Sequence, residues 1–230
     1  MRDRVAPARS VRIAVPAYTD LSRDTEDSVM RGCKAVVDAG IEIQDFDALP
    51  GTYIDRARCV LVANFLNSDA DDLVFIDADV GFEPDSLVRL CQATRPVVAG
   101  IYPKKMEPRE WPVAPLSEEV WSDRDGLVEC TMVPTGFLRI HRSVFEALTV
   151  AHFHDRIGGQ IGAYFKTDIR DGQYWGEDVE FCRLVREAGG HIYAFADMFM
   201  RHTHDPGGRN EKVYSGSWGP WLREQVREAA

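Results

Sequence analysis

Two aspartates, Asp77 and Asp79, directly follow an apolar run in the stretch DDLVFIDADVGF at 71–82. Residues i and i+2 of an extended chain lie on the same side, so both carboxylates are expected to face one point. Two carboxylates held close repel each other unless a cation lies between them. Their oxygens suit Mg²⁺ or Mn²⁺, which proteins bind through one or two carboxylates and substrate phosphates. An ordinary solvated turn is the alternative for an isolated pair of this kind, because Asp is common in turns.

The aspartate pair needs a scaffold, and the first half of the chain predicts one by alternating strands with helices. The run 73–76 is apolar throughout, as in a strand buried on both faces of a parallel sheet. Further strands are predicted at 11–18, 41–46 and 96–102, and helices at 25–39, 53–67 and 84–94. This order predicts an α/β fold with a mainly parallel, Rossmann-like sheet flanked by helices. Ligands of such sheets bind beyond the carboxyl ends of the strands, where the aspartates lie.

Capping and turn residues mark the ends of several elements. Asp24 or Thr25 is expected to cap the helix 25–39, and Gly40 to end it. Asp125-Gly126 predicts the turn of a small hairpin within 118–133. The later segments predict helices at 143–148 and 176–190, a strand at 191–196, and a C-terminal loop that is rich in glycine and aromatic residues. A loop of this kind suits a lid over a site.

Composition narrows the classes of protein that fit. With 230 residues and 45% hydrophobic content, the chain is expected to form one domain. Its net charge of -10 argues against general affinity for nucleic acid or anionic membrane. The five cysteines contain no CxxC pair, which favours reduced thiols in a cytoplasmic protein over disulfides or structural zinc. No window approaches the roughly 20 apolar residues of a membrane span, so none is expected.

Several segments resemble, in order, a GT-A fold glycosyltransferase of the family 2 type, especially the compact kind of phage and bacterial genomes. The matching segments are RIAVPAY, DRARCVLVANFLNSDADDLVFIDADVGF, VVAGIYPKK, VPTGFLRIHRSVFE, WGEDVEFCRLVREAGG and HTH. Together they cover most of 11–204. The resemblance implies a single GT-A domain, 1–230, with a nucleotide-binding half at 11–102, an acceptor and catalytic half at 103–204, and a flexible loop and tail at 205–230.

The resemblance implies a role for the aspartate pair. In such enzymes the DxD motif holds a divalent cation, Mn²⁺ or Mg²⁺, on the diphosphate of a nucleotide-sugar donor of the UDP or GDP type. Asp77 and Asp79 stand at that motif. A late histidine often completes the coordination through an imidazole nitrogen, and His202 or His204 is expected to supply it, with His202 preferred.

The segment GEDVEF is expected to start a helix and to carry the catalytic base. Acidic residues at a helix start are often only caps, which is the alternative here. The resemblance implies an inverting enzyme, in which an acidic residue of this segment removes a proton from the attacking acceptor hydroxyl. Asp178 is the first choice for this base and Glu177 the second, while Glu180 is expected to face elsewhere.

Further residues are expected to contact the donor. Tyr18, at the end of the first strand, would meet the nucleobase and ribose, and Arg58 the nucleotide or its phosphates. Gly136 would let the backbone approach the sugar closely. For Arg56 a surface salt bridge is an equally good interpretation. The complete set of residues expected at the donor is Pro16, Ala17, Tyr18, Arg58, Asp77, Ala78, Asp79, Thr135 and Gly136.

The chain departs from the family pattern at two places. The usual Asp-Asp-Gly-Ser run after the second strand is missing, and QDFDALPG stands there instead, which leaves Asp45 and Asp47 as weak candidates for contacting the base. Cys59 follows Arg58 where asparagine is expected.

Alternative functions remain at this point. A nucleotidyltransferase would use a similar acidic site but favours a glycine-rich loop, which VPAYTDLSRD lacks. A non-catalytic nucleotide-sugar-binding protein would keep the fold without turnover. A DNA-modifying glycosyltransferase that acts on hydroxylated bases would need a basic track, for which Lys104, Lys105 and Arg109 are candidates. The preferred prediction is transfer to an acceptor glycan or another hydroxyl-bearing molecule.

Overall fold

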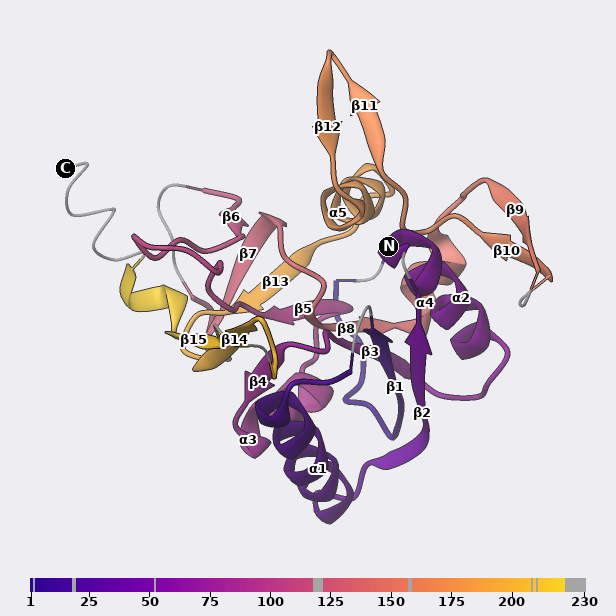
Figure 1. Cartoon of the computed structure of the whole chain (residues 1–230). Helices are drawn as coiled ribbons and strands as arrows, with labels where there is room; N and C mark the ends of the chain where they lie inside the picture. The colour runs from indigo at the N-terminus through magenta and orange to yellow at the C-terminus, as the bar shows by residue number, and fades with distance from the viewer. Residues whose placement is uncertain are drawn as a thin grey trace.

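A mixed eight-stranded sheet forms the centre of the molecule (Figure 1). The computed structural model describes residues 1, 3–17, 20–51, 53–117, 122–156, 159–207, 209 and 211–221. In spatial order the strands are β2 (Glu42–Pro50), β1 (Ser10–Ala17), β3 (Asp72–Ile76), β8 (Phe137–His141), β5 (Val97–Gly100), β13 (Ile192–Phe195), β7 (Leu127–Met132) and β6 (Ala114–Pro115). The α/β class predicted from the sequence is confirmed.

Helices cover both faces of this sheet. One face is covered by α1 (Arg23–Asp38) and α3 (Pro84–Gln92), which pack against each other (Figure 1). The other face carries α2 (Ile54–Leu66), α4 (Arg142–Ala147) and α5 (Glu177–Glu187). Alternate residues of β3 enter opposite cores: Leu73 and Phe75 pack with the α2 side, and Val74 with the α1 side. The continuous apolar run before Asp77 therefore has the two-sided burial that the sequence predicts.

The prediction of a mainly parallel sheet is wrong. Strands β1 and β2, β1 and β3, and β5 and β13 pair in parallel, whereas β8 lies antiparallel between β3 and β5. Strand β7 also runs antiparallel, against both β13 and β6. Phe137, the first residue of β8, pairs with Ile76, the last residue of β3. The segment FLRIH enters the sheet from its carboxyl edge and has to run backwards.

The predicted element ends are largely confirmed, with one correction. Helix α1 is capped by Ser22, whose hydroxyl accepts the backbone N–H of Thr25, and not by Asp24 or Thr25. Gly40 follows α1 with a φ of +80°, a left-handed conformation that glycine adopts without strain. The turn at Asp125-Gly126 is present, with Gly126 at φ +78°. Its second arm is β7, while 118–121 of the expected first arm lie outside the described residues.

A second, three-stranded sheet lies beside the site end of β3. It contains β4 (Val80–Phe82), β14 (Met200–His204) and β15 (Lys212–Gly216), all antiparallel. The sequence predicted a loop and flexible tail at 205–230, so strand β15 corrects that expectation for the part described. Trp218 is fully buried and its indole N–H donates to the Phe195 carbonyl at 2.7 Å. The segment after β14 is therefore packed into the body of the protein.

Two hairpins were not predicted. They are formed by β9 (His152–Asp155) with β10 (Gly159–Gly162), and by β11 (Asp168–Arg170) with β12 (Gln173–Trp175). The hairpin β11–β12 stands above α5 and projects from the molecule (Figure 1). Its strands have three residues each, which is too short for an alternating pattern to stand out in the sequence.

The five cysteines are free thiols, and all except the half-buried Cys33 are buried. None of the helices in the described ranges combines the length and the apolarity that crossing a membrane requires.

Candidate functional site

The turn that carries Asp77 and Asp79 is held between two neighbouring elements. Directly after β3, the Asp77 N–H donates to the Gly136 carbonyl at 2.9 Å, just before β8 begins. The Asp79 carbonyl accepts the backbone N–H of Thr203, on β14, at 2.8 Å. The turn is thus fixed at the carboxyl end of β3, where an α/β sheet binds its ligands.

Arg58 joins Asp77 to the start of helix α5. It lies on α2 with only 2% of its side chain exposed, and its Nη2 donates to Asp77 Oδ1 at 2.8 Å. Its Nε lies 3.4 Å from Glu177 Oε1, and the guanidinium stacks on the Phe75 ring. Burial alone would lower the pKa of Arg58, but the two carboxylates outweigh it and raise the pKa. Arg58 therefore stays charged within the protein.

Part of the Arg58 guanidinium is left without a hydrogen bond. Among the described residues, Nε and Nη1 of Arg58 are buried and have no hydrogen-bond partner. Buried donors are nearly always satisfied in proteins, and each exception needs an explanation. A guanidinium with unused N–H groups beside an acidic turn is suited to a phosphate oxygen that enters the site.

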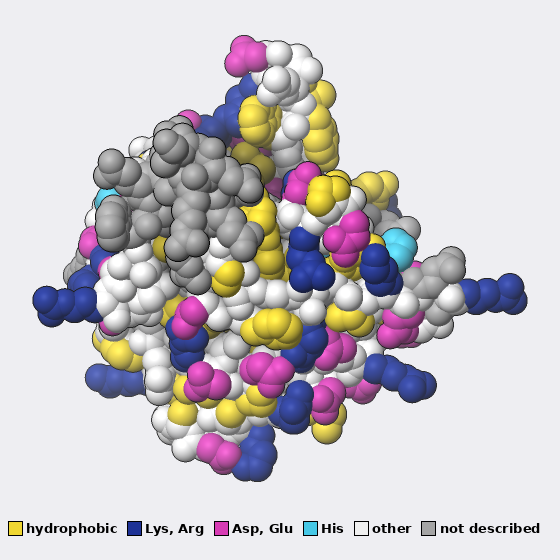
Figure 2. Space-filling view, turned by 90° about the vertical axis from the view of Figure 1, so that its left-hand side faces the viewer, with side chains coloured by type: hydrophobic (Ala, Val, Ile, Leu, Met, Phe, Trp, Pro, Cys, Tyr) yellow, Lys and Arg dark blue, Asp and Glu magenta, His cyan; other side chains and the backbone are white. Residues whose placement is uncertain are grey.

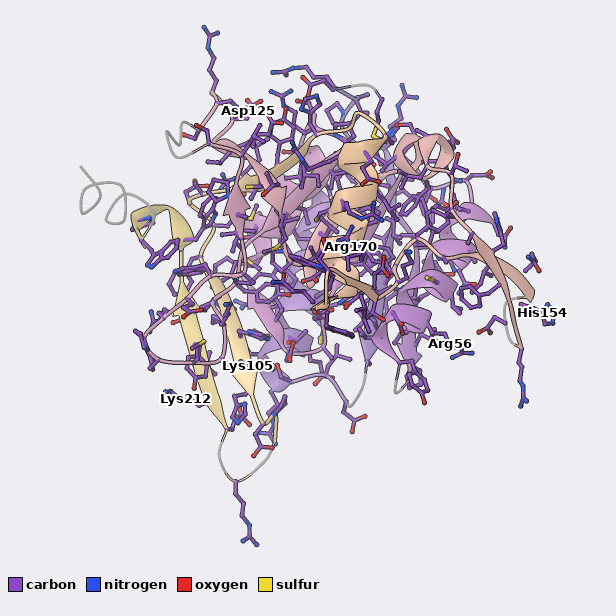
Figure 3. The ribbon with its side chains drawn as sticks, turned by 90° about the horizontal axis from the view of Figure 1, so that it is seen from above. Arg56, Lys105, Asp125, His154, Arg170 and Lys212 are labelled. Carbon is purple, nitrogen blue, oxygen red and sulfur yellow. The ribbon has the colours of Figure 1, made fainter. Side chains whose placement is uncertain are left out.

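Asp79 is engaged by two basic side chains, His202 and Lys105. His202 Nε2 lies 3.5 Å from Asp79 Oδ1, and the Lys105 ammonium forms an ion pair with Oδ2. His202 Nδ1 lies 2.8 Å from the Pro103 carbonyl and must be its donor, so Nε2 is the nitrogen presented to Asp79. Burial would raise the pKa of Asp79, but His202 and Lys105 outweigh it and lower the pKa to about 2. Figure 3 shows Lys105 beside strands β14 and β15.

Tyr102 lies between the acidic residues of the site. Its hydroxyl accepts the Gly136 N–H at 3.1 Å, and its ring packs edge-on to His202 with 4.8 Å between ring centroids. Burial, and then the charges of Asp77 and Asp79 among others, raise its pKa well above the usual value, so the phenol stays protonated. The two aspartates thus line one region around Tyr102. Their carboxylates nevertheless turn to different cations, and the predicted convergence on a single point is not seen.

Gly136 leaves space that a larger residue would fill. A Cβ at this position would overlap Asp77 Oδ2 and Tyr102 Oη, and would lie 2.8 Å from Asp77 Cγ. The Gly136 backbone was expected to approach the sugar closely. In the structure it closely approaches the side chains of Asp77 and Tyr102. Its neighbour Thr135 is buried.

Glu177 and Asp178 occupy the first turn of α5. Burial raises the pKa of both carboxyls, and Arg58 opposes this rise. Asp178 Oδ1 accepts the N–H of Val179 at 2.7 Å, and Asp178 and Asp77 interact through their charges. The four carboxylates of the site face two permanent cations, Arg58 and Lys105, which leaves an excess of two negative charges. An excess of this size in a partly buried site favours binding of a further cation.

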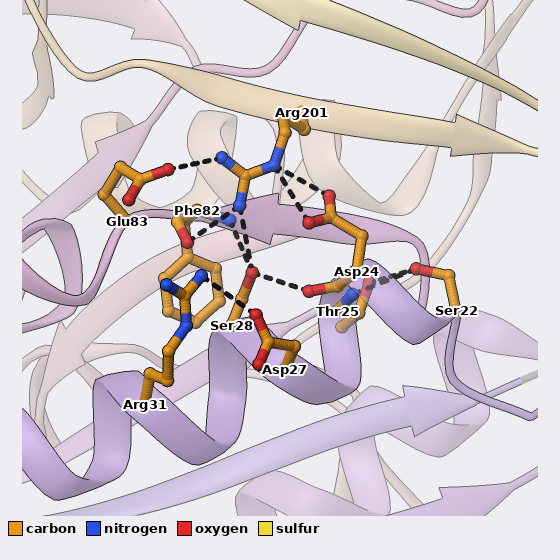
Figure 4. A network of polar contacts seen from close by, with 9 residues as sticks. All are labelled: Ser22, Asp24, Thr25, Asp27, Ser28, Arg31, Phe82, Glu83 and Arg201. Atoms are coloured by element: carbon orange, nitrogen blue, oxygen red, sulfur yellow. Dashed lines mark hydrogen bonds and ion pairs between the residues drawn. The ribbon is translucent and has the colours of Figure 1, made fainter.

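Arg201, on β14, anchors the strand that presents His202 (Figure 4). Its Nε donates to both carboxylate oxygens of Asp24, at 2.8 and 3.0 Å, and its Nη1 donates to Glu83 at 2.6 Å. Its Nη2 contacts the Ser28 hydroxyl at 3.2 Å and the Phe82 carbonyl at 3.1 Å. These contacts join β14 to helix α1 and strand β4, and so hold the neighbouring His202 against the aspartate turn.

The other residues expected to contact the nucleotide-sugar donor lie at this edge of the sheet, as far as the structure describes them. Pro16 and Ala17 are buried at the end of β1, and the Ala78 carbonyl accepts the N–H of Ser22 at 2.8 Å. Tyr18 lies outside the described residues. His204 is exposed at the end of β14 and, in the described structure, contacts neither aspartate, so the geometry favours His202.

Several residues considered in the sequence analysis form ion pairs away from the aspartate turn. Asp45 and Asp47 pair with Arg12 on the neighbouring strand, at 2.9 and 2.6 Å. Arg56 pairs with Asp155 at 2.6 Å, which is the salt-bridge alternative. Glu180 is buried against Arg170 and Arg183 and faces away from the site, as predicted.

The three basic residues of the loop considered for DNA binding all contact partners within the protein. Lys104 pairs with Glu110 at 2.8 Å, Lys105 pairs with Asp79, and Arg109 donates to the Ser215 carbonyl. Their involvement in these contacts leaves no continuous track for a nucleic-acid strand in the described part of the loop.

The side chains at the site provide only part of the ligands that a divalent cation needs. Within the described ranges, no group of three or more His, Cys, Asp or Glu side chains is placed to hold a metal ion. Asp79 and His202 do come together, and they offer a carboxylate oxygen and an imidazole nitrogen. Mg²⁺ and Mn²⁺ sites of nucleotide enzymes often use only one or two protein ligands, because phosphates supply the others. The residues present therefore fit an ion that is shared with a diphosphate.

Sequence reasoning missed part of the arrangement. The contacts of Lys105 with Asp79 and of Tyr102 with Gly136 were not foreseen. Arg201 was not singled out, although its position next to the candidate His202 was a signal. Arg58 was expected to contact the sugar donor, but it also bridges Asp77 and Glu177, which lie 100 residues apart, and no local pattern reveals such a contact.

Comparison with known proteins is informative for the fold. No protein-family model matches the chain, and no curated protein matches its sequence. Among solved structures, one titled "Crystal Structure of A197 from STIV" aligns over 89% of this chain and 93% of that chain, with a TM-score of 0.54 and 19% sequence identity. At this identity the likeness extends to the fold alone. The chain is thus similar in architecture to this viral protein, and its chemistry has to be argued from the site.

Proposed function

We propose that the chain is a glycosyltransferase of GT-A type, which moves a sugar from a nucleotide-sugar donor to an acceptor hydroxyl with inversion at the anomeric carbon. The observation that carries the proposal is the acidic edge of the sheet, where the charges of Asp77, Asp79 and Asp178 all act on the buried Tyr102 and His202 lies beside Asp79. Four separate segments of the chain meet there.

The donor's diphosphate is expected to bind between Arg58 and the aspartate turn. Arg58 has two buried nitrogens without a hydrogen-bond partner in the described structure, and phosphate oxygens would satisfy them. Asp79 and His202 would hold Mn²⁺ or Mg²⁺, whose charge would neutralise the departing nucleoside diphosphate. Lys105, now paired with Asp79, supplies a second positive charge at the same place.

Asp178 is proposed as the catalytic base. It takes the proton of the acceptor hydroxyl while the hydroxyl oxygen forms a bond to the anomeric carbon. The bond from that carbon to the diphosphate oxygen breaks, and its electron pair leaves with the nucleoside diphosphate. The raised pKa of Asp178 makes it a better proton acceptor than an ordinary aspartate. Glu177, held by Arg58, is the less suitable base because its partner stabilises the charged form.

A panel of UDP- and GDP-sugars tests the proposal. With Mn²⁺, at least one donor is expected to release nucleoside diphosphate and to raise the melting temperature of the protein. Asp79→Ala should abolish release while the protein stays folded, and chelation with EDTA should reduce the wild-type rate. The matched control is Asp69→Ala, which removes an exposed aspartate near the opposite end of β3 and should leave release unchanged. Full activity of Asp79→Ala with any donor would refute the proposal.

A further inference from the structure

A pocket of 420 Å³ lies between the hairpin β11–β12, helix α5 and the edge of the sheet. Its volume lies within the range of pockets that bind small molecules. The residues that give it its chemistry are Arg170, Trp175, Val179, Arg183 and Arg186. In Figure 2 the hairpin is the uppermost projection, with hydrophobic side chains along it and Lys or Arg side chains beside it. None of the contacts at the acidic edge involves these five residues, apart from the Val179 backbone.

The pocket carries more positive than negative charge, in a chain whose net charge is -10. Arg170 and Arg183 share the fully buried carboxylate of Glu180, and Arg183 also pairs with Glu187 at the rim. Arg186 is the least neutralised of the three arginines. Its Nη1 reaches the Cys130 carbonyl at 3.4 Å and lies 4.0 Å from Glu129. A guanidinium with such weak partners at an open pocket is available to an incoming anion.

The hairpin presents an aromatic ring beside these charges. Alternation along β11 and β12 places Arg170 and Trp175 on one face, with Ile169 and Tyr174 on the other. The Arg170 guanidinium lies over the Trp175 ring, 5.5 Å from its centroid, and Figure 3 shows Arg170 next to α5. A half-buried indole ring next to guanidinium groups suits a ligand with an apolar face and an anionic substituent.

The pocket adjoins the proposed catalytic base along the chain. Trp175 precedes Glu177 by two residues, and Val179 follows Asp178 directly. Residues 179, 183 and 186 share one face of α5, so the pocket runs along the helix whose first turn carries the base. A molecule held there by its far end would have its near end at the start of α5.

We propose that this pocket binds the acceptor, and that the acceptor is a sugar carrying a phosphate or a carboxylate. The sugar ring lies against the Trp175 indole, and the anionic group binds Arg186 together with Arg170. This inference rests on the proposed glycosyltransferase function, because only that function makes the ligand an acceptor. The volume is sufficient for one or two sugar rings.

Calorimetric titration with glucose 6-phosphate, glucuronate, glucose and inorganic phosphate tests the binding. Glucose 6-phosphate or glucuronate is expected to bind at least about tenfold more tightly than glucose, because a charge-assisted hydrogen bond is gained. Arg186→Gln should remove this preference. Trp175→Ala should weaken binding of the charged sugar and leave that of inorganic phosphate unchanged. Arg31→Gln, on the exposed surface of α1, is the matched control and should bind as the wild type does.

The outcomes separate this inference from the proposed function. The acceptor pocket would be overturned if a charged sugar bound no more tightly than glucose. It would also be overturned if Arg186→Gln kept the wild-type melting temperature and the wild-type affinity for the charged sugar. If Asp79→Ala keeps full donor turnover while charged-sugar binding still needs Arg186, the catalytic proposal fails and the binding site stands.

Discussion

Strand β3 carries an Asp–Arg pair at each end, and the two pairs have different surroundings. At its start, Asp72 and Arg139 are both fully buried, 2.7 Å apart, and Arg139 also donates to the Arg95 carbonyl. At its end, Asp77 keeps 23% of its side chain exposed and shares the buried Arg58 with Glu177. Arg139 Nε and Asp72 Oδ1 lack hydrogen-bond partners in the described structure, as two nitrogens of Arg58 do. The first pair is therefore set apart by its complete burial, whereas the second belongs to a partly exposed site with surplus negative charge.

The difference teaches how to separate a structural acid from a functional one. Burial raises the pKa of Asp72 to about 6, and Arg139 only partly opposes the rise. Asp72 has one partner of opposite charge and no open region beside it. Around Asp77, by contrast, four carboxylates meet two permanent cations, and Gly136 leaves room for close approach. A carboxylate at a strand end indicates a site when its neighbourhood is unbalanced and accessible, and not because it is acidic.

The largest expected effect comes from removing Arg139. Arg139→Met should lower the free energy of unfolding by about 3–5 kcal/mol, because it leaves Asp72 buried without a partner. Arg58→Met should cost clearly less, because Asp77 and Glu177 can still reach water. Urea denaturation of the two variants measures both values. Equal costs would mean that the two ends of β3 are energetically alike.

A double variant serves as the control for that comparison. Asp72→Leu with Arg139→Met replaces the buried ion pair by apolar side chains, and should recover most of the loss seen with Arg139→Met alone. If the double variant is as unstable as the single one, the cost comes from the lost volume and packing of Arg139 and not from an unpaired charge.

The next effect concerns catalysis at the other end of the strand. Asp178→Asn should slow sugar transfer by a factor of about 10² or more, with donor affinity nearly intact, because the amide cannot take the acceptor proton. In the wild type, the rate should fall as pH drops through the pKa of Asp178, which lies above the usual aspartate value, because only the carboxylate acts as a base. Steady-state kinetics from about pH 4 to about pH 8 measure both effects.

Asp85→Asn is the matched control for this variant. Asp85 occupies the same position in the first turn of α3 as Asp178 does in α5, but it is exposed. Both substitutions remove a negative charge from a helix start, so a shared helix-dipole effect appears in both. An equal rate loss in the two variants would reassign Asp178 to a capping role and would move the search for the base to Glu177.

Local patterns predicted most elements but not the way they pair. The apolar run of β3, the periodicity of α1 and the glycine after it were visible because they depend on neighbouring residues. The sequence did not reveal that β8 lies antiparallel between β3 and β5, because its place in the sheet is decided by packing with these two strands. The short strands of the hairpins and of the three-stranded sheet carry too few residues to show a period.

The candidate site was predicted residue by residue, but not its contacts. Asp77, Asp79, Asp178 and His202 were chosen from motifs, and the structure brings them to one edge of the sheet. Which cation each carboxylate meets depends on side chains from distant segments, as with Lys105 on Asp79. The pocket beside α5 was not predicted, because its arginines and Trp175 lie on three elements, β11, β12 and α5, and none belongs to a recognisable motif.

The smallest expected effect tests the space at the end of β3. Gly136→Ala adds a Cβ that would overlap Asp77 Oδ2 and Tyr102 Oη, so both side chains have to move. The free energy of unfolding should fall by about 1–3 kcal/mol, as for other overpacked sites. Donor affinity should weaken as well, since Asp77 and Tyr102 border the proposed diphosphate position. Thermal unfolding and donor titration measure the two consequences.

Gly51→Ala provides the comparison for that substitution. Gly51 follows β2 at the same edge of the sheet, and a Cβ there would meet no atom within 4 Å. Its stability should change by less than about 0.5 kcal/mol, with unchanged donor binding. If Gly136→Ala behaves like Gly51→Ala, Asp77 and Tyr102 can shift at no cost. The carboxyl end of β3 would then be an adaptable surface and not a site shaped for one ligand, and the contrast with the buried pair at Asp72 would lose its functional meaning.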